Sequence, residues 1–135
     1  MNVTVTQQWN GRDVKIRGKR AVGKSAFEIG LIVESNAKML APVDTGRLAG
    51  SITTQSKTTG TRPEPPAYAI DQIKAPTNDN EVYVGTPVAY GPYQEFGTIR
   101  SSAQPFLRPA LALAQGKSLT IVQEEGRFQL KEYLK

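Results

Sequence analysis

Hydrophobic side chains recur at three- and four-residue steps through one long segment near the start of the chain. Between about Asp13 and Ala41 they share one helical face, formed by Val22, Ala26, Ile29, Val33, Ala37 and Leu40 and widened by Phe27 and Leu31. This spacing is that of an amphipathic helix. Pro42 ends the pattern, because its ring disfavours helical geometry at Ala41 and it lacks an amide hydrogen. We therefore expect a long helix that Pro42 stops.

Shorter elements are predicted for the middle of the chain. Residues 46–50 suit one helical turn, and the threonine-rich residues 51–57 suit a strand. Two further strand candidates, 67–70 and 81–85, are separated by the turn-rich residues 76–80. These strands predict a small, mainly antiparallel sheet.

A second helix is expected in the last third of the chain. It should begin near Pro105 and carry its hydrophobic positions at Leu107, Leu111, Leu119 and Val122. Gly116 should weaken its middle, and Gly126 is a candidate for a break, because glycine disfavours helix interiors.

Two segments lack the apolar content of a core. Residues 1–9 alternate weakly through Val3 and Val5, which is typical of an edge strand or of an arm that orders only on assembly. Residues 58–66 combine Gly60 with three prolines among polar residues, which predicts a mobile excursion. We expect both segments to be free to reach neighbouring molecules.

Length and composition fit one folded domain. The chain has 135 residues, 39% hydrophobic and 21% charged, which is ordinary for a globular protein with one modest core. We predict a single α+β domain over residues 1–135, in which a long N-terminal helix and a C-terminal helix pack on the small sheet. An apolar run of about 18 residues is missing, as is a leader-type start, so we expect no membrane association and a cytoplasmic location.

The residue types that are missing limit the chemistry. The chain has no His and no Cys, which removes disulfides, Cys/His zinc sites, cysteine nucleophiles and imidazole bases. We therefore expect no enzymatic activity and neither a cofactor nor a metal ion.

The net charge of +5 is concentrated near the start of the long helix. Asp13 is the only acid between residues 12 and 24, and the basic residues there are Arg12, Lys15, Arg17, Lys19, Arg20 and Lys24. This basic window could contact a polyanion, either a phosphate backbone or an acidic protein surface. It could equally be the solvated start of a helix, because no aromatic residues are interleaved with the charges. A basic nucleic-acid-binding protein is therefore the alternative function.

Residues 18–25, with the sequence GKRAVGKS, fit the phosphate-loop pattern G-x-x-x-x-G-K-S. A phosphate loop follows a buried hydrophobic strand, whereas residues 12–17 are charged at every second or third position. The chain also leaves no room for the several parallel strands that such a loop serves. We interpret the match as chance sequence in a basic helix start.

Three short segments combine glycine, proline and polar residues in patterns that are typical of turns and helix ends. They are APVDTGRL at 41–48, YGPYQEFGT at 90–98 and PFLRPAL at 105–111. Asp44 or Thr45 can cap the exposed amides of the turn after Pro42. Four aromatic residues cover the open end of the sheet, anchor a subunit contact, or do both: Tyr83, Tyr90, Tyr93 and Phe96.

In this order and at this spacing, the three segments resemble the tail-completion and neck proteins of long-tailed bacteriophages. In that family they correspond to a helix exit, a central strand and turn, and the entry of a second helix. The residues that carry the resemblance are Pro42, Asp44, Thr45, Gly46, Arg47, Leu48, Tyr90, Glu95, Phe96, Gly97, Thr98, Pro105, Phe106, Arg108 and Pro109.

The resemblance implies structural work in the virion. Subunits of the family form a ring at the head-proximal end of the tail or in the neck, and they serve tail completion and head–tail joining. The implied partners are further copies of the chain, other neck and tail proteins and, weakly, packaged DNA, with assembly in the cytoplasm of the bacterial host. For Arg47, Glu95 and Arg108 the resemblance implies support of the fold or subunit contact.

Overall fold

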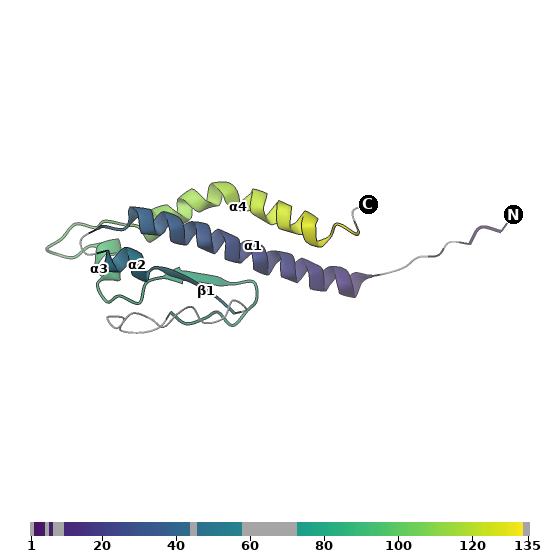
Figure 1. Cartoon of the computed structure of the whole chain (residues 1–135), viewed down its shortest axis with the longest axis horizontal. Coiled ribbons are helices and arrows are strands. Elements are labelled where there is room, and N and C mark those ends of the chain that lie inside the picture. Colours follow the sequence, from purple (N-terminus) through teal and green to yellow (C-terminus); the bar gives the residue numbers. More distant parts are fainter. Residues whose placement is uncertain (1, 5, 7–9, 44–45, 58–72, 134–135) are drawn as a thin grey trace.

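The computed structural model describes residues 2–4, 6, 10–43, 46–57 and 73–133. Within these residues, helices and strands follow in the order α1, α2, β1, β2, α3, α4. The long helix α1 is the middle layer, with α4 along one side and the two-stranded sheet along the other (Figure 1). The predicted α+β class, with a long N-terminal helix, a C-terminal helix and a small antiparallel sheet, is confirmed.

Helix α1 spans Gly11–Leu40 and ends where Pro42 was expected to stop it. Ala41 is the C-cap, with extended backbone at ψ 135°, and its amide donates to the carbonyl of Ala37 at 2.8 Å. The extended geometry is the one that a following proline imposes. The helix therefore ends for a reason that is readable in the sequence.

The buried side of α1 differs from the predicted hydrophobic face. The buried residues are Ala21, Ser25, Gly30, Val33, Glu34 and Ala37. Val22, Leu31 and Leu40, which we expected in the core, are exposed. The physical reason is that α1 is covered from two sides, so close approach of neighbours selects small residues over one broad hydrophobic face.

The sheet consists of β1, Thr53–Ser56, and β2, Val82–Gly85, paired antiparallel from Thr53↔Gly85 to Ser56↔Val82. It crosses α1 at Gly30, where an added Cβ would lie 2.6 Å from Val82 Cγ1 and 2.7 Å from Thr54 Cγ2. Only glycine allows the strands to come this close. The predicted strand at 67–70 and the excursion at 58–66 lie outside the described residues.

The short helix α2, Arg47–Ser51, precedes β1 and confirms the predicted turn. Ser51 belongs to this helix and Ile52 is its C-cap, so the strand begins two residues later than expected. Leu48 and Ile52 are buried in the core cluster with Val33, Ala37 and Phe106. This cluster lies where α1, α2 and the start of α4 meet.

Helix α3, Gly91–Phe96, replaces the strand that the resemblance implied for this segment, and the implied turn follows it at Gly97 and Thr98. Pro92 in its first turn is the sequence signal that favours a helix start here.

Helix α4, Leu107–Gln129, runs antiparallel to α1 (Figure 1) and continues through both Gly116 and Gly126. The predicted break at Gly126 is therefore wrong. Within α4 the buried residues are Ala110 and Ala114, whereas the expected core positions Leu111, Leu119 and Val122 are exposed. Alanines face α1 because the two helices approach closely, which leaves the larger side chains at the edges of the contact.

Candidate functional site

The residues of the second and third sequence segments meet at the start of α4, where Glu95 of α3 acts as its cap. The buried carboxylate accepts hydrogen bonds from the backbone amides of Phe106, Leu107 and Arg108 at 2.8, 2.9 and 3.1 Å. The next residue is Pro109, which has no amide hydrogen. All four backbone positions that a helix start leaves unsatisfied are thus accounted for.

The environment of Glu95 stabilises its ionised form. Burial by itself would raise the pKa of this carboxyl group, but the three backbone hydrogen bonds and the side chain of Arg108 outweigh burial and lower the pKa below its ordinary value. A negative charge at this place also interacts favourably with the dipole of α4. Glu95 is therefore a charged cap within the fold.

Arg108 completes this junction from the outside. Its Nε donates to Glu95 Oε1 at 3.0 Å, and its Nη2 donates to the backbone carbonyl of Glu95 at 3.2 Å. The guanidinium carbon lies 5.1 Å from the centre of the Phe96 ring, within the range of a cation–π contact. One arginine thus holds the end of α3 against the start of α4.

The loop between α3 and α4 is tightly turned. Gly97 has φ 76°, and an added Cβ would lie 2.7 Å from the backbone nitrogen of Ala103. The hydroxyl oxygen of Thr98 accepts hydrogen bonds from the backbone amides of Arg100 and Ser101 at 3.3 and 3.0 Å. Ile99, which directly follows Thr98, is fully exposed. The Gly97-Thr98 pair therefore fixes a turn that presents a hydrophobic side chain.

The first segment, residues 41–48, forms the exit from α1. Ala41 and Leu48 are buried, and Val43 is exposed. Gly46 is the N-cap of α2 with φ 72°, a left-handed conformation that favours glycine. Asp44 and Thr45 lie outside the described residues, so their capping role stays a prediction. Arg47, on the first turn of α2, is exposed.

Tyr83 of β2 and the aromatic residues of the second segment are surface residues. Tyr93 and Phe96 are strongly exposed, while Tyr83 and Tyr90 are exposed to a lesser degree. Tyr90 is the N-cap of α3. Exposed aromatic side chains of this kind are common at protein interfaces.

Two grooves open on α1, and the described residues that line one differ from those that line the other. The apolar groove has a volume of about 480 Å³ and is lined by Ala26, Ile29 and Val33 of α1, Val82 and Val84 of β2, and Leu111 of α4, together with Gly30, Leu107 and Arg108. The mixed-charge groove has a volume of about 490 Å³ and includes Ser56 of β1. Each strand therefore borders a different groove.

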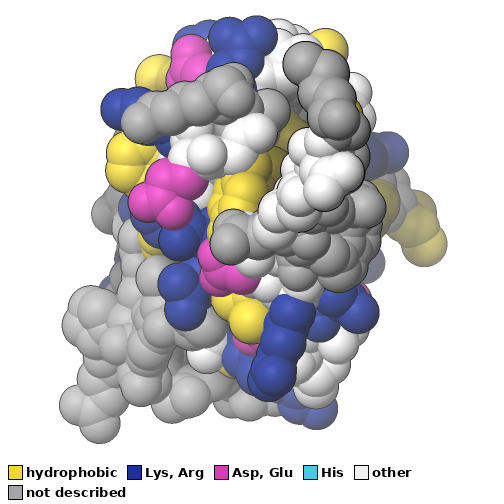
Figure 2. All heavy atoms as spheres, turned by 90° about the vertical axis from the view of Figure 1, so that its right-hand side faces the viewer, with side chains coloured by type: hydrophobic (Ala, Val, Ile, Leu, Met, Phe, Trp, Pro, Cys, Tyr) yellow, Lys and Arg dark blue, Asp and Glu magenta, His cyan; other side chains and the backbone are white. Residues whose placement is uncertain are grey.

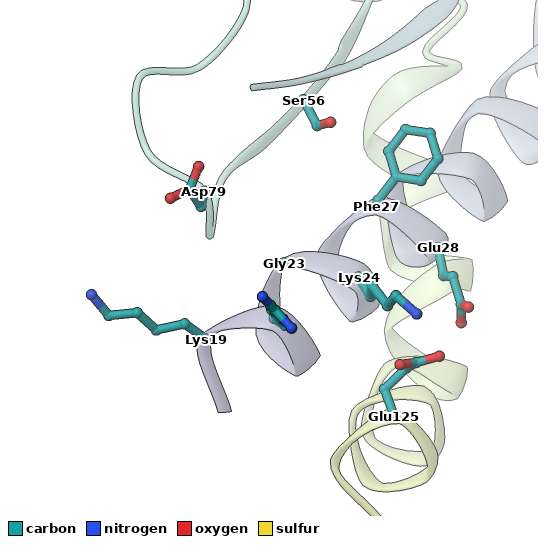
Figure 3. Close-up of a pocket in the computed structure, with 9 residues that line it drawn as sticks. Lys19, Gly23, Lys24, Phe27, Glu28, Ser56, Asp79 and Glu125 are labelled. Carbon is teal, nitrogen blue, oxygen red and sulfur yellow. The ribbon is translucent and has the colours of Figure 1, made fainter. Parts of the chain in front are cut away.

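The mixed-charge groove takes up half of the basic window. Lys19, Arg20 and Lys24 line it together with Glu28, Asp79 and Glu125. Figure 3 shows the amino end of Lys24 turned toward Glu28 and Glu125, whereas Lys19 extends away from them. Among the described residues of this lining, Glu28 and Glu125 offset part of the positive charge, while Asp79 is paired with Lys57 at 3.3 Å. Acidic side chains among the basic ones do not favour a polyanion as the occupant.

The first turns of α1 contact the residues that follow α4. Arg17 Nη2 lies 3.1 Å from Glu132 Oε2 and Arg17 Nε 3.2 Å from Asp13 Oδ2, while the Tyr133 hydroxyl donates to Asp13. The hydrogen bond from Tyr133 and the nearby Arg17 lower the pKa of Asp13. Figure 2 looks onto this end, where basic side chains are spread around the face with acidic ones among them. Arg17 is therefore engaged within the molecule.

The phosphate-loop pattern at residues 18–25 is part of the continuous helix α1. A phosphate loop needs successive backbone amides that point into a turn, and here those amides are taken by the helix. The interpretation as chance sequence agrees with this geometry. In the parts of the chain that the structure describes, no cluster of three acidic side chains could hold a metal ion, and no helix is long and apolar enough to cross a membrane.

Comparison with known proteins identifies a family. The family model described as "Bacteriophage HK97-gp10, putative tail-component" matches residues 10–97, which is more than half of the chain. The matched region includes α1, α2, the sheet and α3 with Glu95. No curated protein and no solved structure gives a significant match.

Proposed function

This chain belongs to the HK97-gp10-like family, a bacteriophage tail component, and we propose that it forms a ring at the head-proximal end of the tail. In this position it serves tail completion and the joining of heads to tails. Its partners are further copies of itself and other neck and tail proteins, and its role is structural, without catalysis. The protein assembles in the host cytoplasm and ends up in the virion.

The observation that carries the proposal is the exposed surface of α4. Leu111, Leu113 and Leu119 are 49%, 60% and 67% exposed, and Val122 and Phe128 are exposed as well. At 100° per residue, Leu111 and Leu113 lie on nearly opposite sides of the helix. The helix therefore offers large hydrophobic side chains to two different directions, although only Ala110 and Ala114 are buried within it.

Hydrophobic surface on two sides suits a subunit of a ring. In a ring, one face of each subunit binds a different face of its neighbour, so both faces must be able to lose contact with water. Monomeric proteins rarely expose this many large hydrophobic side chains on one helix, so the surface of α4 favours association with another molecule. The turn between α3 and α4 adds one more exposed hydrophobic side chain, that of Ile99.

The alternative, a basic nucleic-acid-binding protein, has less support from the same geometry. Arg17 is paired with Asp13 and Glu132, and Lys19, Arg20 and Lys24 share their groove with three acidic residues. The salt-dependent affinity of a nucleic-acid-binding protein needs basic side chains that are available for phosphates. Weak contact with packaged DNA remains compatible with a position in the neck.

The proposal is tested with phage that lack this protein. We expect intact heads and intact tails to accumulate separately in lysates, and we expect protein supplied in trans to restore joined particles. Images of wild-type particles should show the ring at the head-proximal end of the tail. Joined, infectious particles formed in normal number without the protein would overturn the proposal and favour the nucleic-acid alternative.

The surface of α4 is tested by a matched pair of substitutions. Leu119→Lys should leave the thermal unfolding transition unchanged, because the side chain is exposed, yet it should reduce head–tail joining at least tenfold. Thr120→Lys, at the next exposed position of the same helix, is the control and should keep joining within twofold of wild type. Equal effects of the two substitutions would contradict a contact at Leu119.

A further inference from the structure

The apolar groove borders the outer edge of β2. Val82 and Val84 of β2 line it, facing Ile29 of α1 and Leu111 of α4. Within the described residues β2 pairs with β1 alone, and β1 borders the mixed-charge groove instead. The backbone edge of β2 on the groove side therefore has no partner strand in the described part of the chain. An extended segment that enters the groove could add a strand to this edge while burying side chains beside Val82 and Val84.

The sequence contains a segment with the properties of such a strand. Residues 2–6 read NVTVT, with valines two positions apart, which is the spacing at which one face of a strand presents its side chains. Val82 and Val84 are also two positions apart. Val3 is 82% exposed and lies in neither a helix nor a strand. The hydrophobic side chain at Val3 is therefore available for a contact outside its own fold.

Charge also favours this segment. The whole chain carries a net charge of +5, and among the described residues that line the apolar groove the charged one is Arg108. Residues 2–10 contain no charged side chain. They can approach a positively charged copy of the same protein without bringing like charges together.

The length of the segment decides which groove it can reach. Val82 packs against α1 at Gly30, and at a rise of 1.5 Å per residue Gly30 lies about 28 Å along the helix from Gly11. An extended chain covers about 3.3 Å per residue, so Val5 and Val3 extend about 20 and 26 Å from Gly11. The groove begins at Ala26, about 22 Å along the helix from Gly11. Folded back along its own helix, the segment could therefore bring Val3 to the near end of the groove, but Val5 would stop short of it. The groove of a second copy is not limited in this way.

We propose that residues 2–6 of one subunit add as a strand to the edge of β2 in a neighbouring subunit and place Val3 and Val5 in its apolar groove. This inference rests on the proposed ring, since it names one contact between neighbouring subunits in addition to the exposed surface of α4. The contact is heterologous: a segment next to the start of α1 binds the flank of the following molecule. Each subunit gives one segment and receives one, so the chain of contacts continues until the ring closes.

Because the chain has no cysteine, disulfide trapping tests the contact directly. Phage carry Val3→Cys together with Leu111→Cys, which lines the groove, and their assembled tails are oxidised and examined on non-reducing gels. The matched control is Val3→Cys with Leu113→Cys, which is similarly exposed but lies on the opposite side of α4. A disulfide requires Cα atoms within about 7 Å of each other, so the pair reports proximity.

We expect the first pair to give a ladder of covalent multiples of the subunit, and we expect the control pair to stay at the mass of one subunit. Equal ladders from both pairs, a disulfide within one chain, or a cross-link from residue 111 to a different tail protein would each overturn the inference. So would the absence of a ladder in tails whose ring is visible by imaging, and this outcome leaves the proposed ring intact. Normal joining without the protein would instead overturn the proposed function itself.

Discussion

The carboxylate of Glu95 and the backbone amide of Phe106 are joined by a hydrogen bond of 2.8 Å, through which α3 caps α4. Phe106 is fully buried at the point where α4 enters the core. This bond explains why the segments at 90–98 and 105–111 occur together in the sequence. The first segment provides the cap and the tight turn at Gly97, and the second provides the helix start that needs them.

The first prediction concerns this cap. Glu95→Ala should lower the free energy of unfolding by about 2–3 kcal/mol, because it leaves buried amides at the start of α4 without an acceptor. Glu95→Gln should cost less, since its amide oxygen still accepts. The control is Glu124→Ala on the exposed surface of α4, and denaturant unfolding is the measurement. A loss from Glu95→Ala no larger than that from the control would contradict the cap.

The second prediction is a pH dependence with a defined sign. The pKa of Glu95 is lowered in the folded protein relative to its ordinary value of 4.5. The stability that it contributes is therefore fully present above pH 4.5 and is lost as the pH falls toward the lower pKa of the folded state. Thermal melts between pH 6 and pH 3 should show a smaller decrease in Tm for Glu95→Gln than for the wild type. Parallel decreases would show that Glu95 does not contribute.

The third prediction compares two glycines of α1. Gly30→Ala should destabilise the protein by about 1–3 kcal/mol, because the new methyl group would overlap Val82 and Thr54. Gly18→Ala is the matched control, since no atom of the described residues lies within 4 Å of its added Cβ. There the better helix propensity of alanine should stabilise the protein by up to about 1 kcal/mol. Denaturant unfolding of both variants measures the difference, and the same sign for both would be evidence against the close crossing.

The fourth prediction concerns the phosphate-loop pattern. Lys24→Ala should leave particle assembly intact, because residues 18–25 form helix rather than a phosphate-binding turn. Its Nζ lies 5.7 Å from the centre of the Phe128 ring, so only a small loss of stability is expected. Calorimetric titration with ATP and magnesium should detect no binding to the wild type. Tight ATP binding that disappears in Lys24→Ala, together with failed assembly, would refute this interpretation.

The fifth prediction concerns residues 1–9. Their deletion should leave the thermal transition of the purified protein nearly unchanged, since Val3 lies outside the core. Head–tail joining should nevertheless decrease, with intact heads and tails accumulating separately. Differential scanning calorimetry and counting of joined particles are the two measurements. If the deletion unfolds the domain, these residues are part of the core and the view of them as an arm is wrong.

Local chemistry in the sequence determined the positions of the main elements. The helical spacing and Pro42 gave the length and the end of α1, and the threonine-rich and alternating segments gave the two paired strands at Thr53–Ser56 and Val82–Gly85. These features depend on residues that are close in the chain, so they can be predicted without knowing which elements pack against each other in the fold. The order of the three sequence segments likewise indicated the phage tail family that the comparison supports.

Only the tertiary structure decided which residues are buried. Val22 and Leu111 have the hydrophobic character of core residues, yet they are exposed while Ala21 and Ala110 are buried. The spacing of hydrophobic residues assumes one covered face per helix, whereas α1 is packed from two sides at distances that only small residues allow. The capping role of Glu95 could not be predicted from the sequence for a related reason. The amides that it accepts begin eleven residues later in the chain, and they reach the carboxylate only when α3 folds against α4.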